Sequence, residues 1–133
     1  MTKYLTIDEV ISIHDDLLKE HGGLWGIRDR GSLESCVEMP KSFTFGVELH
    51  KTVYDKAASY LFYIVKNHPF NDGNKRCGAF SALVFLEGNG IAIKFPMDKF
   101  EEMVVGVAEG KYKKEEIAHF LEFGVIKEIK VFR

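Results

Sequence analysis

One short segment, HPFNDGNKR at positions 68–76, interrupts two stretches of helical apolar spacing and thereby fixes where one helix ends and another begins. Upstream, apolar residues recur at intervals of three and four up to Val65, and Pro69 disfavours helical dihedrals in the residue before it. Downstream, the same spacing continues to Leu86 and stops at Gly88, a residue type common just past helix ends. The segment is therefore predicted to be a tight loop that leads straight into a second helix.

The predicted loop carries groups that bind phosphate and metal. The backbone N–H groups of Gly73, Asn74 and Lys75 should be unpaired first-turn donors of the second helix, where the helix dipole favours negative charge and a phosphate fits. Asp72 offers a hard oxygen suited to Mg²⁺, which usually binds through one or two carboxylates and substrate phosphates. Lys75 and Arg76 add positive charge, and only the arginine has a planar fork.

His68 is the one group of the segment that can accept a proton near neutral pH, and we assign it as the general base. Taken singly, the residues have ordinary roles: His68 would cap or pack at a helix end, Asp72 would be an N-cap, and residues 74–76 would be a solvated first turn. His68 and Asp72 could also be two metal ligands, but no further His or Cys cluster supports a zinc site. Phe70 is interpreted as a core anchor for the loop.

The whole chain, residues 1–133, is predicted to be one domain. A length of 133 residues suits a single domain, and 46% hydrophobic residues can furnish its core. The sequence is almost wholly helical in pattern, so the predicted fold class is all-α. A capping box at positions 6–9 opens a first helix, which ends at Gly22, and His14 lies on the apolar stripe of this helix as a packing residue and not a ligand. A short helix is expected over 32–38.

The remaining segments give weaker patterns. The string KSFTFG at 41–46 predicts a loop or small hairpin, and residues 91–95 alternate like a short extended piece. Asp98 and Glu101 are predicted to form a second N-terminal capping pair, and a final helix is expected near 115–123. A tail from Val125 to Arg133 could pack, pair or bind.

The motif HPFNDGNKR resembles the signature of the Fic/Doc superfamily, HxFx(D/E)GNxR, and specifically that of its Doc (death-on-curing) branch. The likeness extends to GIRDRGSLESCVEMP at 26–40, FLEGNGI at 85–91 and VAEGKYKKEEIAHFL at 107–121, so it covers essentially the whole chain. The resemblance implies the compact helical fold of this family with a short flap, which aligns a target peptide by strand-like pairing. Phe43 and Phe45 of that flap could contact the target or pack in the core.

The resemblance also implies residue roles. His68 would deprotonate a hydroxyl of a target protein, Asp72 would hold Mg²⁺, Gly73 and Asn74 would form an anion hole, and Arg76 would contact phosphate. Two departures bear on the reaction. Adenylylating Fic enzymes resemble HxFx(D/E)GNGRxxR, with a glycine where this chain has Lys75 and a second arginine where it has Ala79.

Both departures disfavour attack on the alpha-phosphate. In Doc-type members that share the lysine, the nucleotide is understood to bind reversed, so that its gamma-phosphoryl group meets the nucleophile. The resemblance therefore implies a protein kinase that uses ATP and Mg²⁺, acts on a threonine of bacterial elongation factor Tu and blocks translation. A Fic-type adenylyltransferase and a non-catalytic partner-binding module are the alternatives.

Partners and compartment are also expected. A Doc-like toxin would be restrained by a small antitoxin that folds onto it, in a groove lined by the first helix and the helices before the motif. Net charge is −2 and pI is about 6.2, so the chain lacks a basic footprint for nucleic acid. Cys36 and Cys77 predict reduced thiols, and no stretch approaches a membrane span, so the expected compartment is the cytoplasm.

Overall fold

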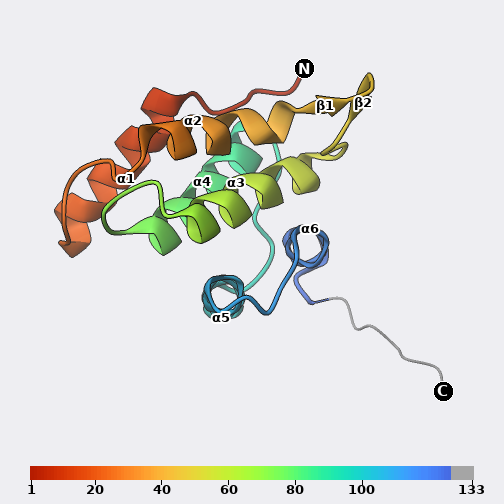
Figure 1. The fold of residues 1–133 in the computed structure, drawn as a ribbon. Coiled ribbons are helices and arrows are strands. Elements are labelled where there is room, and N and C mark those ends of the chain that lie inside the picture. Colours follow the sequence, from red (N-terminus) through yellow and green to blue (C-terminus); the bar gives the residue numbers. More distant parts are fainter. Residues whose placement is uncertain (127–133) are drawn as a thin grey trace.

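A computed structural model of the protein describes residues 1–126, and it is built mainly from helices (Figure 1). Within these residues the elements are six α-helices, one 3-10 turn and one two-stranded hairpin, which confirms the predicted all-α fold with a short hairpin. The elements in chain order are α1 (Ile7–His21), α2 (Arg30–Glu38), the 3-10 turn (Met39–Lys41), β1 (Phe43–Thr44), β2 (Val47–Glu48), α3 (Val53–Asn67), α4 (Asn74–Gly88), α5 (Met97–Ala108) and α6 (Lys114–Phe123).

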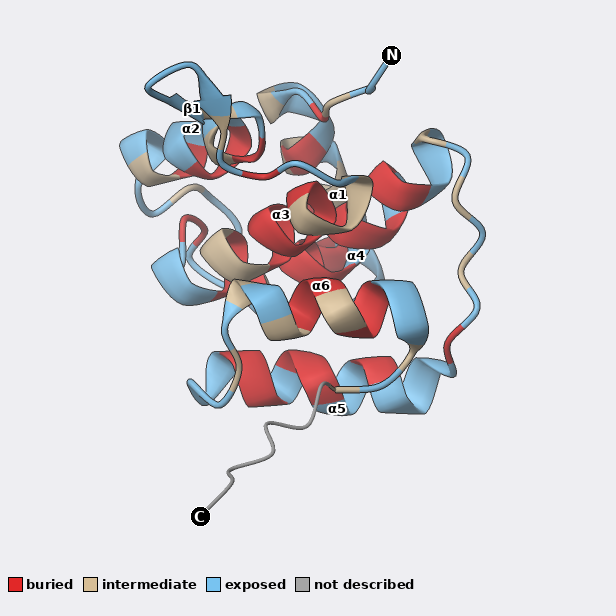
Figure 2. Ribbon diagram, turned by 90° about the vertical axis from the view of Figure 1, so that its right-hand side faces the viewer, coloured by how far each residue is buried: buried red, intermediate tan, exposed pale blue. Residues whose placement is uncertain are grey.

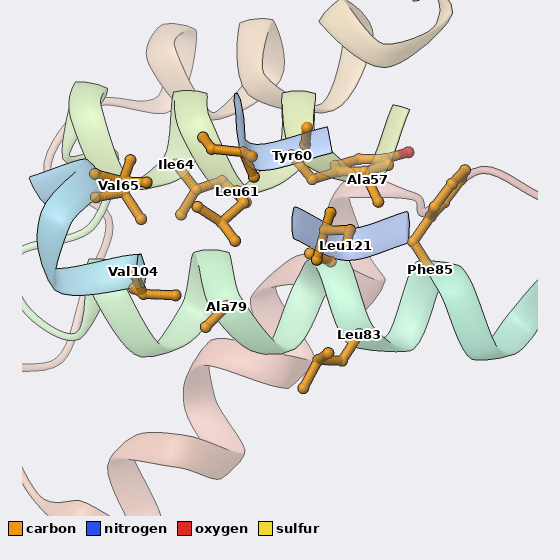
Figure 3. Close-up of a cluster of buried hydrophobic side chains, with 14 of the residues drawn as sticks. Ala57, Tyr60, Leu61, Ile64, Val65, Ala79, Leu83, Phe85, Val104 and Leu121 are labelled. Carbon is orange, nitrogen blue, oxygen red and sulfur yellow. The ribbon is translucent and has the colours of Figure 1, made fainter. Parts of the chain in front are cut away.

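The helices α3 and α4 lie side by side at the centre of the fold. The helices α1 and α2 pack on one side of this pair, and α5 and α6 pack on the other (Figures 1 and 2). The buried side chains meet where these layers touch, and they form one apolar core (Figure 3). The loop that joins α3 to α4 is thus fixed at both ends by the best-packed helices of the protein.

Small residues let α3 and α4 approach closely. Ala57, Ala58 and Ala82 are fully buried. Gly78 in α4 faces α3 so closely that an added Cβ would lie 2.8 Å from Val65 Cγ2 and 3.1 Å from the Leu61 carbonyl oxygen. A side chain at position 78 would therefore push the two helices apart.

Replacing Gly78 by valine should lower the free energy of unfolding by about 1–3 kcal/mol, because overpacking a tight core forces backbone shifts. Gly88→Ala is the matched control, since nothing lies within 4 Å of the added Cβ there, and its stability should be unchanged or slightly higher. Chemical denaturation of both variants tests this. Equal stability of the two variants would show that the α3–α4 contact is not tight.

The predicted helix boundaries hold to within one or two residues. The capping box between Thr6 and Glu9 is present and opens α1. The helix α2 begins at Arg30, two residues before the predicted start, because the Asp29 side chain accepts a hydrogen bond from the Ser32 N–H at 3.0 Å and acts as its N-cap. The helix α4 includes Gly88 and is capped by Asn89.

The predicted capping pair at Asp98 and Glu101 is wrong. The helix α5 starts at Met97 with Pro96 as its N-cap, and no side chain caps it. Asp98 consequently lies inside the first turn, where its charge still favours the helix dipole. Residues 91–95 show the expected alternation of exposure but belong to no strand. The predictions for the tail concern mostly residues 127–133, which lie outside the described residues.

A loop or a small hairpin was predicted for positions 41–46, and the structure confirms the hairpin, with strands at 43–44 and 47–48. Phe43 pairs with Glu48 and Thr44 with Val47 in antiparallel register. The turn between the strands consists of Phe45 and Gly46, both with positive φ, of 50° and 75°. The Phe43 side chain is 62% exposed and that of Phe45 is fully exposed, so neither packs in the core.

Both cysteines are free and buried, as predicted for thiols outside a disulfide. Burial raises the pKa of the Cys36 thiol to about 11 and that of Cys77 to about 12. Thiolate is the reactive form, so both side chains act as small core residues. Among the described helices, none has the length and apolarity needed to cross a bilayer.

Candidate active site

The motif loop begins with a backbone conformation that is rare for a residue other than glycine. His68 is the C-cap of α3 and adopts the left-handed region, with φ 49° and ψ 58°. Such a conformation costs roughly 1–3 kcal/mol and is typical of functional sites, where surrounding contacts hold it in place. The His68 side chain is exposed. The proposed base is thus presented to solvent at a turn that the protein must stabilise.

Arg28 supplies that stabilisation from the segment between α1 and α2. Its guanidinium donates to the His68 carbonyl at 2.6 Å and to the Asn67 carbonyl at 2.7 Å, two acceptors left open at the end of α3. The backbone next to Arg28 lies alongside the motif loop, since Ile27 and Phe70 form an antiparallel bridge. No role was predicted for Arg28, since nothing in the neighbouring sequence marks it as a partner of His68.

Replacing Arg28 by methionine should lower the free energy of unfolding by about 1–2 kcal/mol, because two hydrogen bonds to the loop are lost. Arg30→Met is the control: Arg30 is exposed and its one ion pair, to Glu34 at 3.5 Å, is of a kind worth at most about 0.5 kcal/mol. Urea denaturation that ranks the two variants equally would contradict this role for Arg28.

Asn74 closes the loop upon itself. Its side chain is buried, accepts from the Phe70 N–H at 3.0 Å and donates to the Phe70 carbonyl at 3.0 Å. The side chain is therefore committed to the loop, and the backbone N–H of Asn74 is the group left for an anion. Phe70 is 1% exposed, which confirms the predicted core anchor.

The N-terminus of α4 is open. Gly73 is its N-cap with φ 78°, and no side chain caps the helix. In the part of the chain that the structure describes, no acceptor meets the N–H groups of Asn74, Lys75 or Arg76. The N–H of Gly73 differs from the prediction, because it donates to Asp72 Oδ1 at 2.9 Å.

Two cations stand at this open end. Lys75 and Arg76 are exposed, and neither has a carboxylate within 4.0 Å among residues 1–126. Three N–H groups, the dipole of α4 and the charge of Arg76 therefore meet beside Asp72, with Lys75 exposed on the same turn, and an arrangement of this kind can bind phosphate.

Asp72 borders a cavity of about 280 Å³ next to this point. The cavity lies between the motif and the end of α1, and its lining residues are Leu17, Leu18, His21, Gly22, Gly23, Asp72, Gly73 and Arg76. Asp72 Oδ2 accepts a long hydrogen bond from the Leu24 N–H at 3.3 Å, and a Cβ on Gly23 would lie 2.9 Å from the same oxygen. A side chain at position 23 would therefore displace the Asp72 carboxylate, and the φ of 127° at Gly23 also favours glycine.

The cavity brings together three of the predicted site residues, Asp72, Gly73 and Arg76. His68 is exposed on the motif loop and Lys75 is exposed in the first turn of α4, and neither lines the cavity. A volume of 280 Å³ lies just below the roughly 300–1000 Å³ typical of small-molecule pockets, so it suits a phosphate group with its cation better than a whole nucleotide.

The donor set fits Mg²⁺ rather than zinc. Asp72 has lone pairs beyond those that accept from Gly73 and Leu24, and it borders the open N-terminus of α4, so it would hold Mg²⁺ beside a phosphate bound there. Within residues 1–126 no three His, Cys, Asp or Glu side chains gather as a metal cluster. A closed zinc site needs such a cluster.

His14 lies beneath the loop. It is 1% exposed, as expected for a packing histidine on the apolar stripe of α1. Its Nε2 is 2.8 Å from the Asp72 carbonyl oxygen, and its ring stacks on Phe70 with 3.7 Å between centroids. The apolar spacing of α1 predicted that this residue is buried, but gave no indication that it contacts the motif.

Known proteins resemble this chain in sequence. The model of the Fic/DOC family matches residues 4–86, which include α1 to α3, most of α4 and the entire motif. "Protein kinase doc" of Escherichia phage P1 is 30% identical over 119 residues, which cover 90% of this chain and 93% of the phage protein. "Toxin Doc" of Mycolicibacterium smegmatis is 34% identical over 110 residues, which cover 81% of this chain and 82% of the relative.

Proposed function

The chain belongs to the Fic/DOC family, and we propose that it is a Doc-type toxin that transfers the gamma-phosphoryl group of ATP to a protein hydroxyl. Threonine is the expected acceptor and elongation factor Tu the expected target, so that translation would stop. We base this on the open N-terminus of α4, where N–H groups that have no acceptor among residues 1–126 lie beside Asp72 and Arg76, with Lys75 exposed on the same turn. The names of the two relatives, a protein kinase and a toxin, support it.

The proposed reaction assigns one step to each group. His68 takes the proton from the target hydroxyl, whose oxygen attacks the gamma-phosphorus as the bond to the beta-phosphate oxygen breaks and ADP leaves. The N–H groups of α4 and the Arg76 guanidinium stabilise the charge on the phosphate oxygens. Mg²⁺ at Asp72 supplies further charge neutralisation when bound.

The choice of the gamma-phosphorus is supported by Ala79. In the adenylylating branch an arginine stands at the corresponding position, whereas here the side chain is 8% exposed and lies in the core between the helices (Figure 3). An arginine clamp on the phosphates is therefore missing at this position. Lys75, in place of glycine, adds bulk and charge at the second residue of α4.

Labelled ATP separates the proposed kinase from an adenylyltransferase. The protein is incubated with a bacterial lysate, Mg²⁺ and ATP labelled at either the gamma- or the alpha-phosphate. The proposal is supported if a protein band is labelled by gamma-labelled ATP and not by alpha-labelled ATP. Label from alpha-labelled ATP alone would overturn it in favour of nucleotidyl transfer.

We propose that the hairpin β1–β2 receives the target peptide. Its two strands are short and exposed, and backbone pairing along such an edge gives affinity without strict sequence demands. The fully exposed Phe45 at its turn has a strained positive φ, which marks it as a candidate contact rather than a packing residue.

Replacing Phe45 by asparagine should raise KM for the protein target roughly tenfold, as expected for loss of an aromatic contact. Stability should be unchanged or higher, because asparagine before glycine is favoured in a two-residue hairpin turn. Phe123→Asn is the control, since Phe123 is 62% exposed on α6. Steady-state kinetics with the purified target measure this. An unchanged KM would remove Phe45 from the target site.

We further propose a small antitoxin as the second partner, because both relatives are Doc proteins and one is named a toxin. The expected groove is lined by α1 and the helices that precede the motif. An antitoxin segment that folds there would bury apolar surface and lose conformational entropy. The ATP and the elongation factor that the reaction needs would place it in the cytoplasm.

A further inference from the structure

We propose that His14 is a positioning residue of the active site, which fixes the Asp72–Gly73 peptide from beneath and thereby orients the Asp72 carboxylate. This inference rests on the proposed function, in which Asp72 holds Mg²⁺. His14 is far from the motif in sequence and touches no substrate group. Its effect is transmitted through a single peptide unit.

The first step is the hydrogen bond of the buried ring. His14 Nε2 lies 2.8 Å from the Asp72 carbonyl oxygen. A carbonyl oxygen only accepts, so Nε2 carries the proton and donates it. The other nitrogen, Nδ1, lies 3.0 Å from Asp15 Oδ1. The ring itself is 1% exposed, so it lies inside the protein while it contacts the loop.

The second step is the geometry of the peptide that follows Asp72. A trans peptide is planar, and its C=O and N–H point in opposite directions. When His14 draws the Asp72 C=O toward the core, the Gly73 N–H of the same peptide must point outward. That N–H donates to Asp72 Oδ1 at 2.9 Å. His14 thus sets the direction of the donor that orients the carboxylate.

The third step is the fit of the ring under the loop. The rings of His14 and Phe70 are nearly parallel, at 7° with 3.7 Å between centroids. A Cβ added to Gly73 would lie 3.6 Å from His14 Nε2. One buried ring therefore contacts Phe70, Asp72 and Gly73, and Phe70 is itself held by Asn74. Packing explains the stack, whereas the hydrogen bond satisfies the buried ring N–H and at the same time holds the Asp72 carbonyl group.

A pair of variants separates these two roles. His14→Phe keeps an aromatic ring against Phe70 and removes the donor, whereas His14→Gln keeps a donor near the Nε2 position and removes the ring. Both are compared with the wild type at a temperature where circular dichroism shows them folded. In the free ¹⁵N-labelled protein, His14→Phe should shift the Gly73 amide signal and speed its hydrogen exchange, and His14→Gln should restore both toward wild type.

The second readout is the Mg²⁺ requirement of gamma-phosphoryl transfer. His14→Phe should raise the Mg²⁺ concentration for half-maximal rate about tenfold or more, as expected for a group that orients a metal ligand, and leave KM for the protein target unchanged. His14→Gln should lie close to wild type.

The outcomes keep the two proposals apart. A His14→Phe protein that is folded, with a wild-type Gly73 amide and a wild-type Mg²⁺ requirement, would overturn the role of His14. The role of His14 would also be overturned if both variants lost transfer rate only in proportion to the fall in their melting temperatures. If the wild type transfers no phosphate to any protein, the proposed function fails, while the Gly73 amide still decides whether His14 positions the loop.

Discussion

Replacing His68 by asparagine should lower the rate of phosphoryl transfer by roughly 10²- to 10⁴-fold, the usual contribution of a general base. Asparagine cannot accept the proton, yet it is one of the few residues that tolerate the left-handed conformation that His68 adopts. Stability should therefore stay close to wild type, which separates loss of chemistry from loss of fold. Initial rates with gamma-labelled ATP, together with thermal unfolding, measure both effects.

His119→Asn is the matched control for this experiment. His119 is a half-buried histidine on α6 that contacts the Val125 carbonyl and no part of the motif loop. Its replacement should leave the transfer rate unchanged. If His68→Asn transferred phosphate at the wild-type rate, His68 would not be the base. If the variant were inactive in transfer but still arrested growth on expression, the protein would act as a non-catalytic binding module.

The second large effect is expected from Asp72→Asn, which should lower the transfer rate by roughly 10²-fold or more at ordinary Mg²⁺ concentrations. A metal ion contributes several kcal/mol to a transition state of this kind, and the neutral amide is a poor ligand for it. The amide oxygen can still accept from the Gly73 N–H, so the loop should keep its shape. Rates measured across a Mg²⁺ titration give the result.

Asp98→Asn serves as the control, because Asp98 is an exposed carboxylate in the first turn of α5. It should show the Mg²⁺ dependence of the wild type. A wild-type dependence in Asp72→Asn would mean that the metal ligand lies elsewhere.

Local rules recovered most of the helical architecture. Pro69 after His68 predicted the end of α3. The capping box between Thr6 and Glu9 predicted the start of α1, and the structure contains it. Such signals lie within a few residues of the feature that they predict. Where the local signal was ambiguous, the prediction failed: Asp98 and Glu101 have capping spacing, but α5 begins at Met97 and leaves Asp98 within its first turn.

The supports of the site could not be predicted from the sequence. His14 is 58 positions from Asp72, and Arg28 is 40 from His68. A histidine on an apolar stripe and an arginine in a loop have no sequence pattern that specifies their partners, because the contacts exist only once α1 and the following segment pack on the loop. Asn74 was expected to belong to an anion hole, and no local pattern indicated that its side chain binds the backbone of Phe70.

The intact mass of purified elongation factor Tu, after incubation with this protein, ATP and Mg²⁺, tests the central claim most directly. We predict a gain of one phosphate group per molecule, on a threonine, that His68→Asn does not produce. A gain of one AMP group instead would contradict gamma-phosphoryl transfer and point to adenylylation.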